Sequence, residues 1–219
     1  MTGSGSLESF LEKWRARWPE WGVAMAFIPR EQRSLVAAWS CLLQELSDAA
    51  WGGGDPTPGL AKLAWWQEEL RGWARGARRH PLGEALQRQQ APWEALGRAL
   101  AVLPKTRAPG SAGEDAEALG AFATQLLACE AVLFGGREPD ARAAVDVVAG
   151  LRAERALVQG DRGIAAGLRH ALRPSAPSRP RRLQQVVVRE RLRLMEAGDA
   201  RGRVAALRLV FAGWRAARG

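Results

Sequence analysis

The sequence predicts an all-α protein, a multi-helix bundle without a β-sheet, on three observations. The 219 residues are rich in Ala, Leu, Arg and Glu, contain no Tyr and hold few β-branched residues, a composition that favours helix over strand. Stretches with apolar residues at helical spacing are repeatedly ended by Gly or Pro. No stretch alternates apolar and polar residues as a half-buried strand does. These patterns together indicate an antiparallel bundle of helices.

In the first half of the chain, proline and glycine separate the predicted helices. Pro19 and Pro29 break the N-terminal region, and the GGGDP run at residues 52–56 is a clear stop. Thr57 followed by Pro58 predicts an N-cap and a first helical turn. The predicted helices of this half span residues 6–18, 30–51, 57–77, 82–89 and 93–103.

The N-terminal segment carries a tryptophan stripe. Trp14, Trp18 and Trp21 repeat at i, i+4 and i+7, the spacing of one helix face. Pro19 lies between them and is expected to bend or end the helix there.

The second half of the chain shows the same alternation of helix and break. Residues 104–113 and 174–180 are rich in Pro, Gly and Ser and are interpreted as loops. Because neither side of the first loop looks able to close a core alone, residues 1–219 are predicted to form a single domain, with a basic helical segment at 179–219. The predicted helices of this half span residues 114–134, 141–159, 164–172, 182–197 and 201–218.

The net charge of +9 is concentrated at the C-terminal end of the chain. Residues 169–219 hold 13 Arg against 3 acidic residues, a net charge of +10, so the rest of the chain carries −1. Such a segment suits nucleic acid, an anionic lipid surface or an acidic protein, or it is simply a solvated helix face. We expect an anionic membrane surface, with no specific nucleic acid, and expect these side chains to make the contact: Arg189, Arg191, Arg193, Arg201, Arg203 and Arg208.

No membrane span is expected, because charges interrupt every long apolar run. No secretory signal is expected either. Cys41 and Cys129 both fall in apolar helical patterns, and two buried thiols are expected rather than a disulfide. A cytoplasmic location is expected, either free or peripheral to the inner face of a membrane.

Three segments follow one another in an order and spacing that point to a family. They are FIPREQR at residues 27–33, LAWWQEEL at 63–70 and the His80-Pro81 pair. Over residues 27–90 the chain resembles the squalene/phytoene synthase family, of which it looks like a degenerate and short member. The resemblance implies an isoprenoid-synthase-like all-α fold. It is faint from residue 119 to 168 and absent after that.

Members of that family condense two isoprenyl diphosphates, and acids on two helices hold Mg²⁺ against the departing diphosphate. Carboxylates spaced i and i+4 present their oxygens on one helical face, which is why the motif has that form. The first motif falls at residues 47–51, where only Asp48 remains of three expected aspartates. Glu45, three residues earlier, is placed to share its face.

The second motif falls at residues 151–157 and is more degraded. Arg152 matches, but Ala153 and Leu157 occupy the two acid positions, Glu154 is off register, and Arg155 adds a positive charge. One of five expected carboxylates therefore survives, and Asp48 is the single candidate metal ligand.

The candidate residues of a ligand cavity are Glu45, Asp48, Trp65, Trp66, Arg33 and Arg152. Glu45 and Asp48 are expected to face the interior near Trp66 and Arg152. Alternatively, the two acids form salt bridges to Arg33, Arg71 or Arg152.

The aromatic and histidine residues also have two interpretations each. Trp65 and Trp66 line a prenyl-chain pocket, or Trp66 is core and Trp65 packs on a neighbouring helix. His80 is a base or, more in keeping with its place before Pro81, a capping or surface residue. His170 is given no chemistry, and no zinc site is expected from two distant histidines.

We therefore expect a squalene/phytoene synthase family protein that has lost most of its Mg²⁺-binding aspartates and is non-catalytic. It would bind an isoprenoid or lipid-like ligand, or act as an assembly or interaction factor through a protein partner. The alternative is an active prenyl transferase that condenses isoprenyl diphosphates. No cofactor is expected, and Mg²⁺ enters only if the enzyme alternative holds.

Overall fold

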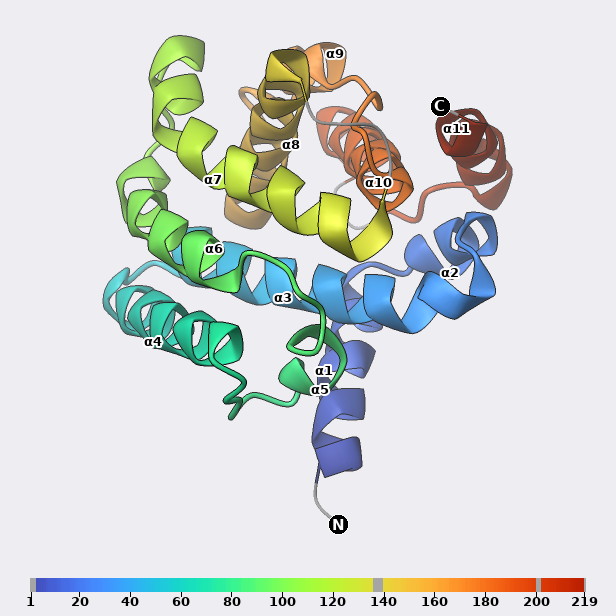
Figure 1. Cartoon of the computed structure of the whole chain (residues 1–219). Helices are drawn as coiled ribbons and strands as arrows, with labels where there is room; N and C mark the ends of the chain where they lie inside the picture. Colours follow the sequence, from blue (N-terminus) through green and yellow to red (C-terminus); the bar gives the residue numbers. More distant parts are fainter. Residues whose placement is uncertain (1–2, 136–139, 200–201, 219) are drawn as a thin grey trace.

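The computed structural model describes residues 3–135, 140–199 and 202–218, and within them it contains eleven α-helices and no β-strand. This confirms the predicted all-α class (Figure 1). The α-helices are α1 (Gly3–Arg17), α2 (Trp21–Ala24), α3 (Arg33–Trp51), α4 (Thr57–Ala74), α5 (Gly83–Leu86), α6 (Trp93–Ala99), α7 (Ala112–Phe134), α8 (Ala141–Gln159), α9 (Ala165–Ala171), α10 (Arg179–Glu196) and α11 (Ala206–Arg218). Three 3₁₀ helices join them: η1 (Met25–Phe27), η2 (Arg30–Gln32) and η3 (Leu100–Thr106).

Helix α3 runs through the middle of the bundle (Figure 1). It contacts α1, α4, α5 and α8, so neighbours surround it on several sides. Helices α4 and α6 pack on each other, α7 lies on α6 and α8, and α10 packs on α8, α9 and α11. Helix α11 closes against α2 and η1, which brings the C-terminal helix beside an N-terminal segment. A contiguous set of buried apolar residues extends from Trp14 to Ala216.

Glycine ends two long helices where the sequence predicts. Helix α7 stops at Phe134 and α8 at Gln159, and the next residues, Gly135 and Gly160, have φ of 64° and 70°. A residue with a Cβ adopts this left-handed conformation at an energetic cost, so glycine is the natural end point.

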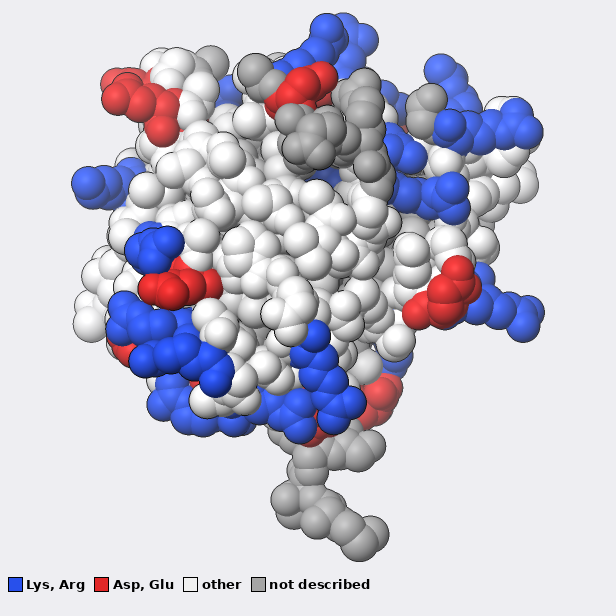
Figure 2. All heavy atoms as spheres, in the orientation of Figure 1, with Lys and Arg blue, Asp and Glu red and all other residues white. Residues whose placement is uncertain are grey.

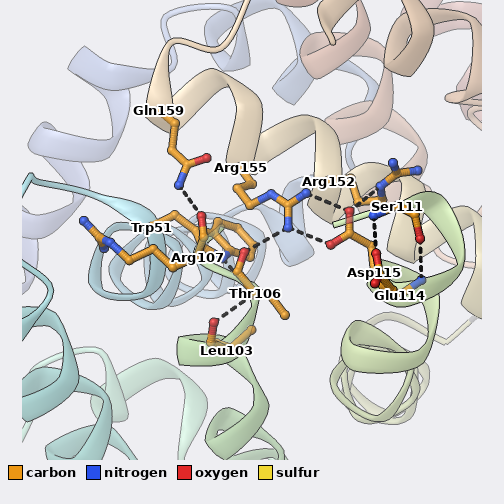
Figure 3. Close-up of polar contacts among 10 residues, drawn as sticks. All are labelled: Trp51, Leu103, Thr106, Arg107, Ser111, Glu114, Asp115, Arg152, Arg155 and Gln159. Atoms are coloured by element: carbon orange, nitrogen blue, oxygen red, sulfur yellow. Dashed lines mark hydrogen bonds and ion pairs between the residues drawn. The ribbon is translucent and has the colours of Figure 1, made fainter. Parts of the chain in front are cut away.

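The predicted loop at 104–113 is wrong in its first part, where η3 continues the preceding helix as a 3₁₀ turn (Figure 3). The Thr106 hydroxyl stabilises this turn, because it donates to the Leu103 carbonyl at 2.8 Å and accepts from Trp51 Nε1 at 3.0 Å. Helix α7 then begins at a capping box between Ser111 and Glu114, in which each side chain accepts the other's backbone N–H.

Several predicted helix starts also need correction. Helices α3, α10 and α11 begin at Arg33, Arg179 and Ala206 rather than at residues 30, 182 and 201. Helix α1 already includes Ser6, since it begins at Gly3. Thr57 is the first residue of α4 rather than its cap, and its backbone N–H donates to Asp55 Oδ1 at 2.9 Å. Asp55, two residues before Thr57, makes the same type of bond as a capping side chain. The sequence prediction chose Thr57 as the cap because Pro58 follows it.

The crossing of α3 and α4 depends on a glycine. A Cβ placed on Gly59 would lie 2.1 Å from the backbone oxygen of Ala49. Real Cβ contacts are never that close, so the two helices approach to a distance that only glycine permits.

Among the described residues, one helix is long and apolar enough to cross a membrane, contrary to the expectation from the sequence. Residues Gly113–Phe134 of α7 are long and apolar enough to span a bilayer by length and composition, with a mean hydropathy of 1.4. In the fold this helix belongs to the core, and Leu119, Phe122 and Leu126 are buried in it. A core helix satisfies the same test, so this observation by itself is weak evidence for a membrane.

Cys41 and Cys129 are free, buried thiols, as expected. Burial raises the pKa of Cys41 to about 12 and also raises the pKa of Cys129. Neither thiol is therefore poised for nucleophilic chemistry.

Candidate functional site

The candidate site is a pocket bounded by α1, α2, α3, α7, α8 and α10, which we call the tryptophan pocket. With its open mouth it has a volume of about 550 Å³, little of which is wide enough for a water molecule. It is thus a narrow slot with room for a few waters, and a larger ligand enters only when side chains rotate. Its apolar lining consists of Trp14, Trp18, Trp21, Trp39, Leu43, Val158 and Pro180.

The tryptophan stripe of the sequence supplies one wall of this pocket. The ring centroids of Trp14 and Trp21 lie 5.6 Å apart. Pro19 ends α1 near Trp18, and the short helix α2 then brings Trp21 back beside Trp14. The Arg191 guanidinium lies 4.3 Å from the Trp18 ring centroid and holds that ring in place.

A buried ion pair forms part of the polar lining. Glu130 on α7 accepts hydrogen bonds from Trp39 Nε1 at 3.0 Å, from Ser178 Oγ at 2.8 Å and from Arg181 Nε at 2.9 Å. Glu130 is 2% and Arg181 4% exposed, so the pair is fully desolvated. The Glu130 carboxylate raises the pKa of Arg181 against the opposing effect of burial. This pair joins α3, α7 and α10 at the pocket.

Glu154 on α8 is the second buried acid of the pocket. Its Oε1 accepts from Gln184 Nε2 at 3.0 Å, and Gln184 Oε1 in turn accepts from Trp21 Nε1 at 2.8 Å. Burial raises the pKa of Glu154, with the Glu130 carboxylate adding to the shift and Arg181 opposing it. The protonated form of Glu154 is therefore favoured more than in an exposed glutamate.

Asp48 lies at the more exposed part of the pocket, where its carboxylate is 3.8 Å from Arg17. Burial raises the pKa of Asp48, Arg17 lowers it and the nearby Glu45 raises it. The neighbouring Gln44 Oε1 is buried and has no hydrogen-bond partner among the described residues. The pocket thus presents one unsatisfied acceptor beside the Asp48 carboxyl group.

Of the six cavity residues predicted from the sequence, the structure brings only Asp48 to this pocket. Glu45 turns to the other side of α3 and pairs with Lys62 on α4 at 2.5 Å. Arg33 donates through Nε to the carbonyl of Ile28 at 3.1 Å, which closes the turn before α3. The salt bridges expected to Arg33, Arg71 or Arg152 are therefore replaced by pairs with Lys62 and Arg17.

Trp65 and Trp66 belong to a separate aromatic cluster. Trp66 is 1% exposed and its ring centroid lies 4.6 Å from that of His80, while Trp65 is 38% exposed. His80 Nδ1 accepts the backbone N–H of Leu82 at 3.1 Å, and burial lowers the pKa of His80. These contacts favour the packing interpretation of the two tryptophans and the capping interpretation of the histidine.

Arg152 also points away from the pocket. Its Nε donates to Asp115 Oδ2 at 2.8 Å, and Arg155 donates to both oxygens of the same carboxylate (Figure 3). The pocket-facing residues of α8 are instead Glu154 and Val158. Ala153 and Leu157, the two acid positions expected for the second motif, do not line this pocket, and Arg155, expected to be a repelling charge, is neutralised by Asp115.

Several pocket residues escaped the sequence analysis. Glu130 could have been identified from the sequence as a buried acid, since it is a lone acid in the apolar second half of α7. Arg181 gave no such signal, because arginine is common throughout the C-terminal segment, and Gln184 gave none, because a glutamine in a helix carries no specific pattern.

Among the described residues, no group of three or more His, Cys, Asp or Glu side chains is placed to hold a metal ion. Asp48, the single candidate ligand, faces Arg17 rather than a second carboxylate. The arrangement can bury an apolar group against indole rings and accept hydrogen bonds from its polar end. No protein-family model, curated protein or solved structure matches this chain.

Proposed function

We propose that this protein is a non-catalytic relative of the squalene/phytoene synthases that binds an uncharged isoprenoid or lipid-like molecule in the tryptophan pocket. The observation that carries the proposal is the state of the pocket's acids. Glu130 is held by Arg181, Trp39 and Ser178, Glu154 by Gln184, and Asp48 by Arg17. Acids engaged in this way do not form a Mg²⁺ cage, and Mg²⁺ prefers several free oxygen ligands in octahedral geometry.

The charge of the pocket argues against a diphosphate ligand. Its lining contains two arginines, Arg17 and Arg181, against the carboxyl groups of Asp48, Glu130 and Glu154. Even with Glu154 protonated, the lining carries no net positive charge. Without a metal, a diphosphate would lose its hydration and gain no opposite charge, which is unfavourable.

The polar groups of the pocket suit a hydroxyl. Gln44 Oε1 needs a donor, and the Asp48 carboxyl lies beside it. A hydroxyl donates there, while an alkyl or prenyl chain packs on Trp14, Trp21 and Trp39. Because the free slot is narrow, chain entry requires indole rotation, which makes tryptophan fluorescence a direct reporter.

The experiment is a titration of the full chain with farnesol and with farnesyl diphosphate, with and without Mg²⁺, followed by tryptophan fluorescence. We expect saturable quenching with farnesol and none with the diphosphate in either condition. Saturable, Mg²⁺-requiring binding or turnover of the diphosphate would support the prenyl transferase alternative. Absence of binding by both ligands would end the proposal.

A matched pair of variants ties the signal to the pocket. Ser47→Phe fills the slot from α3 and should abolish farnesol binding. Thr124→Phe adds the same side chain at an exposed position of α7, outside the pocket lining, and should leave binding unchanged. Equal loss in both variants would show that the ligand does not occupy the tryptophan pocket.

The same proposal places the protein in the cytoplasm, at the inner face of a membrane from which an apolar ligand would be drawn. Two free, buried thiols support a reducing compartment.

A further inference from the structure

Helix α11 presents a row of large apolar side chains to solvent. Leu207, Val210, Phe211 and Trp214 are 74%, 41%, 68% and 48% exposed. They follow the spacing i, i+3, i+4 and i+7, which places them on one helical face. Scattered exposed apolar residues are ordinary, but four that are contiguous on a short helix form a patch.

The apolar face of α11 points to solvent because the opposite face of the helix packs against the bundle. Leu209, Gly213 and Ala216 are the buried residues of the helix. A Cβ on Gly213 would lie 2.8 Å from the Phe27 ring, so the backbone sits directly on η1. The Ala216 carbonyl accepts from Arg182 Nε at 2.6 Å, which holds the last turn to α10. The apolar row is therefore a built surface of the bundle and not one side of a loose tail.

Arginines border the apolar row, and α11 carries no acidic residue. Arg208 and Arg215 line a groove shared with Arg189 of α10, in which Glu190 is the single carboxylate. Neither Arg189 nor Arg215 has an ion-pair partner within the described part of the chain. Figure 2 shows basic side chains gathered at its upper right, where α10 and α11 lie in Figure 1.

The arginine face expected from the sequence is corrected by this arrangement. Arg191 forms an ion pair with Glu20 at 2.8 Å, and Arg193 forms one with Glu190 at 3.0 Å. Arg201 lies outside the described residues, while Arg203 is exposed just before α11. Arg208 lies 3.8 Å from the same Glu190 carboxylate. Of the six side chains, only Arg189 both lines the groove beside the row and has no ion-pair partner among the described residues.

We propose that α11 lies in the interface of an anionic membrane, with Leu207, Phe211 and Trp214 inserted among the acyl chains and the unpaired Arg189 and Arg215 on phospholipid phosphates. An apolar face bordered by arginine and free of acids is the pattern of interfacial helices. Trp214 stacks with Arg218 at 4.1 Å, which gives the row an indole of the kind enriched at membrane–water interfaces. The charge of the border decides for anionic lipid over a second copy of this chain, since two copies would bring their arginines together.

The test is flotation of the full chain with vesicles of phosphatidylcholine alone and of equimolar phosphatidylcholine and phosphatidylglycerol. We expect binding to the anionic vesicles, lost when salt is raised to about 0.5 M. The double variant L207Q/F211Q should lower the bound fraction about tenfold or more, because two inserted side chains are lost. Arg189→Gln with Arg215→Gln should weaken binding and flatten its salt dependence.

A matched control is Val145→Gln on α8, where the wild-type side chain is 64% exposed and stands alone. It should bind vesicles as the wild type does. Trp214→Phe should remove the blue shift of fluorescence that accompanies insertion. Salt-insensitive binding, or no binding to either vesicle, would overturn the proposal. So would a dimer, measured by sedimentation equilibrium, that L207Q/F211Q converts to a monomer while vesicle binding is absent.

Discussion

Arg155 donates through Nη1 and Nη2 to the two carboxylate oxygens of Asp115, at 2.8 and 2.7 Å, and so joins the middle of α8 to the first turn of α7. Arg155 is 0% and Asp115 2% exposed. A third bond from Arg155 reaches the Thr106 carbonyl at 2.9 Å, and Arg152 adds its own bond to Asp115. Burial alone would raise the pKa of Asp115, but the two arginines outweigh it and lower that pKa.

We predict that Arg155→Met lowers the free energy of unfolding by about 3 kcal/mol or more. Removing one partner of a buried pair usually costs about 3–5 kcal/mol, and the remaining bond from Arg152 to Asp115 keeps the expected effect at the lower end of that range. Urea unfolding at neutral pH measures the change. Arg98→Met is the matched control, because the Glu94–Arg98 pair is exposed and should contribute less than about 1 kcal/mol. Equal effects of the two variants would contradict the role given to the buried pair.

Glu154→Gln should make stability less dependent on pH, and the sign follows from the raised pKa of Glu154. Below about pH 4 the carboxyl is protonated in both folded and unfolded chains, so the acid has no unfavourable effect. As pH rises through the folded pKa, the unfolded chain ionises more readily, and the wild type loses stability. Glutamine cannot ionise and still accepts from Gln184.

The two proteins should therefore be equally stable near pH 4, and the glutamine variant more stable at pH 7. Urea unfolding across that range checks this. A variant that is less stable than the wild type at pH 7 would show that the ionised carboxylate is stabilised in the fold.

Gly59→Ala should destabilise the protein by about 1–3 kcal/mol, the effect of forcing extra volume into a packed contact. The reason is the 2.1 Å approach of the added Cβ to the Ala49 carbonyl oxygen, which requires α3 and α4 to move apart. Gly120→Ala on α7 is the control, since nothing lies within 4 Å of its added Cβ. That substitution should stabilise by up to about 1 kcal/mol, as alanine does in an open helix position. Thermal unfolding of both variants distinguishes the two signs.

Magnesium with pyrophosphate should leave the melting temperature unchanged. A ligand that binds only the folded chain raises it, and this chain offers one pocket aspartate, already beside Arg17, for the metal. We likewise expect no Mg²⁺-dependent condensation of farnesyl or geranylgeranyl diphosphate. A Mg²⁺-requiring turnover that disappears in Asp48→Ala would contradict this and restore the enzyme alternative.

The helices were predictable from the sequence because glycine and proline mark their ends, as at Gly135 and Gly160. The site was not, and α3 explains why. Glu45 and Asp48 are about 60° apart on the helix, which predicts a shared face. Because α3 has neighbours on several sides, that offset is enough for the two side chains to meet different helices. Glu45 pairs with Lys62 and Asp48 with Arg17.

Register explains the second miss, on α8. Arg152 and Glu154 are two residues apart, hence on nearly opposite faces, so an error of two residues exchanges the side that faces the pocket for the side that faces α7. Spacing alone does not choose between them. The choice depends on Asp115, which draws Arg152 and Arg155 to α7, and on Gln184, which receives Glu154. Both partners are distant in sequence.

The pairing of the chain's two ends has a consequence for its synthesis on the ribosome. Trp21 is bonded to Gln184, 163 residues later, and Glu20 to Arg191, 171 residues later. At about 5–20 residues per second, roughly 10–30 s pass between the emergence of these partners. Through that interval, Trp14, Trp18 and Trp21 have no α10 to cover them. The nascent chain therefore carries an exposed aromatic segment of the kind that chaperones bind, and its N-terminal helices reach their final packing only after α10 has emerged.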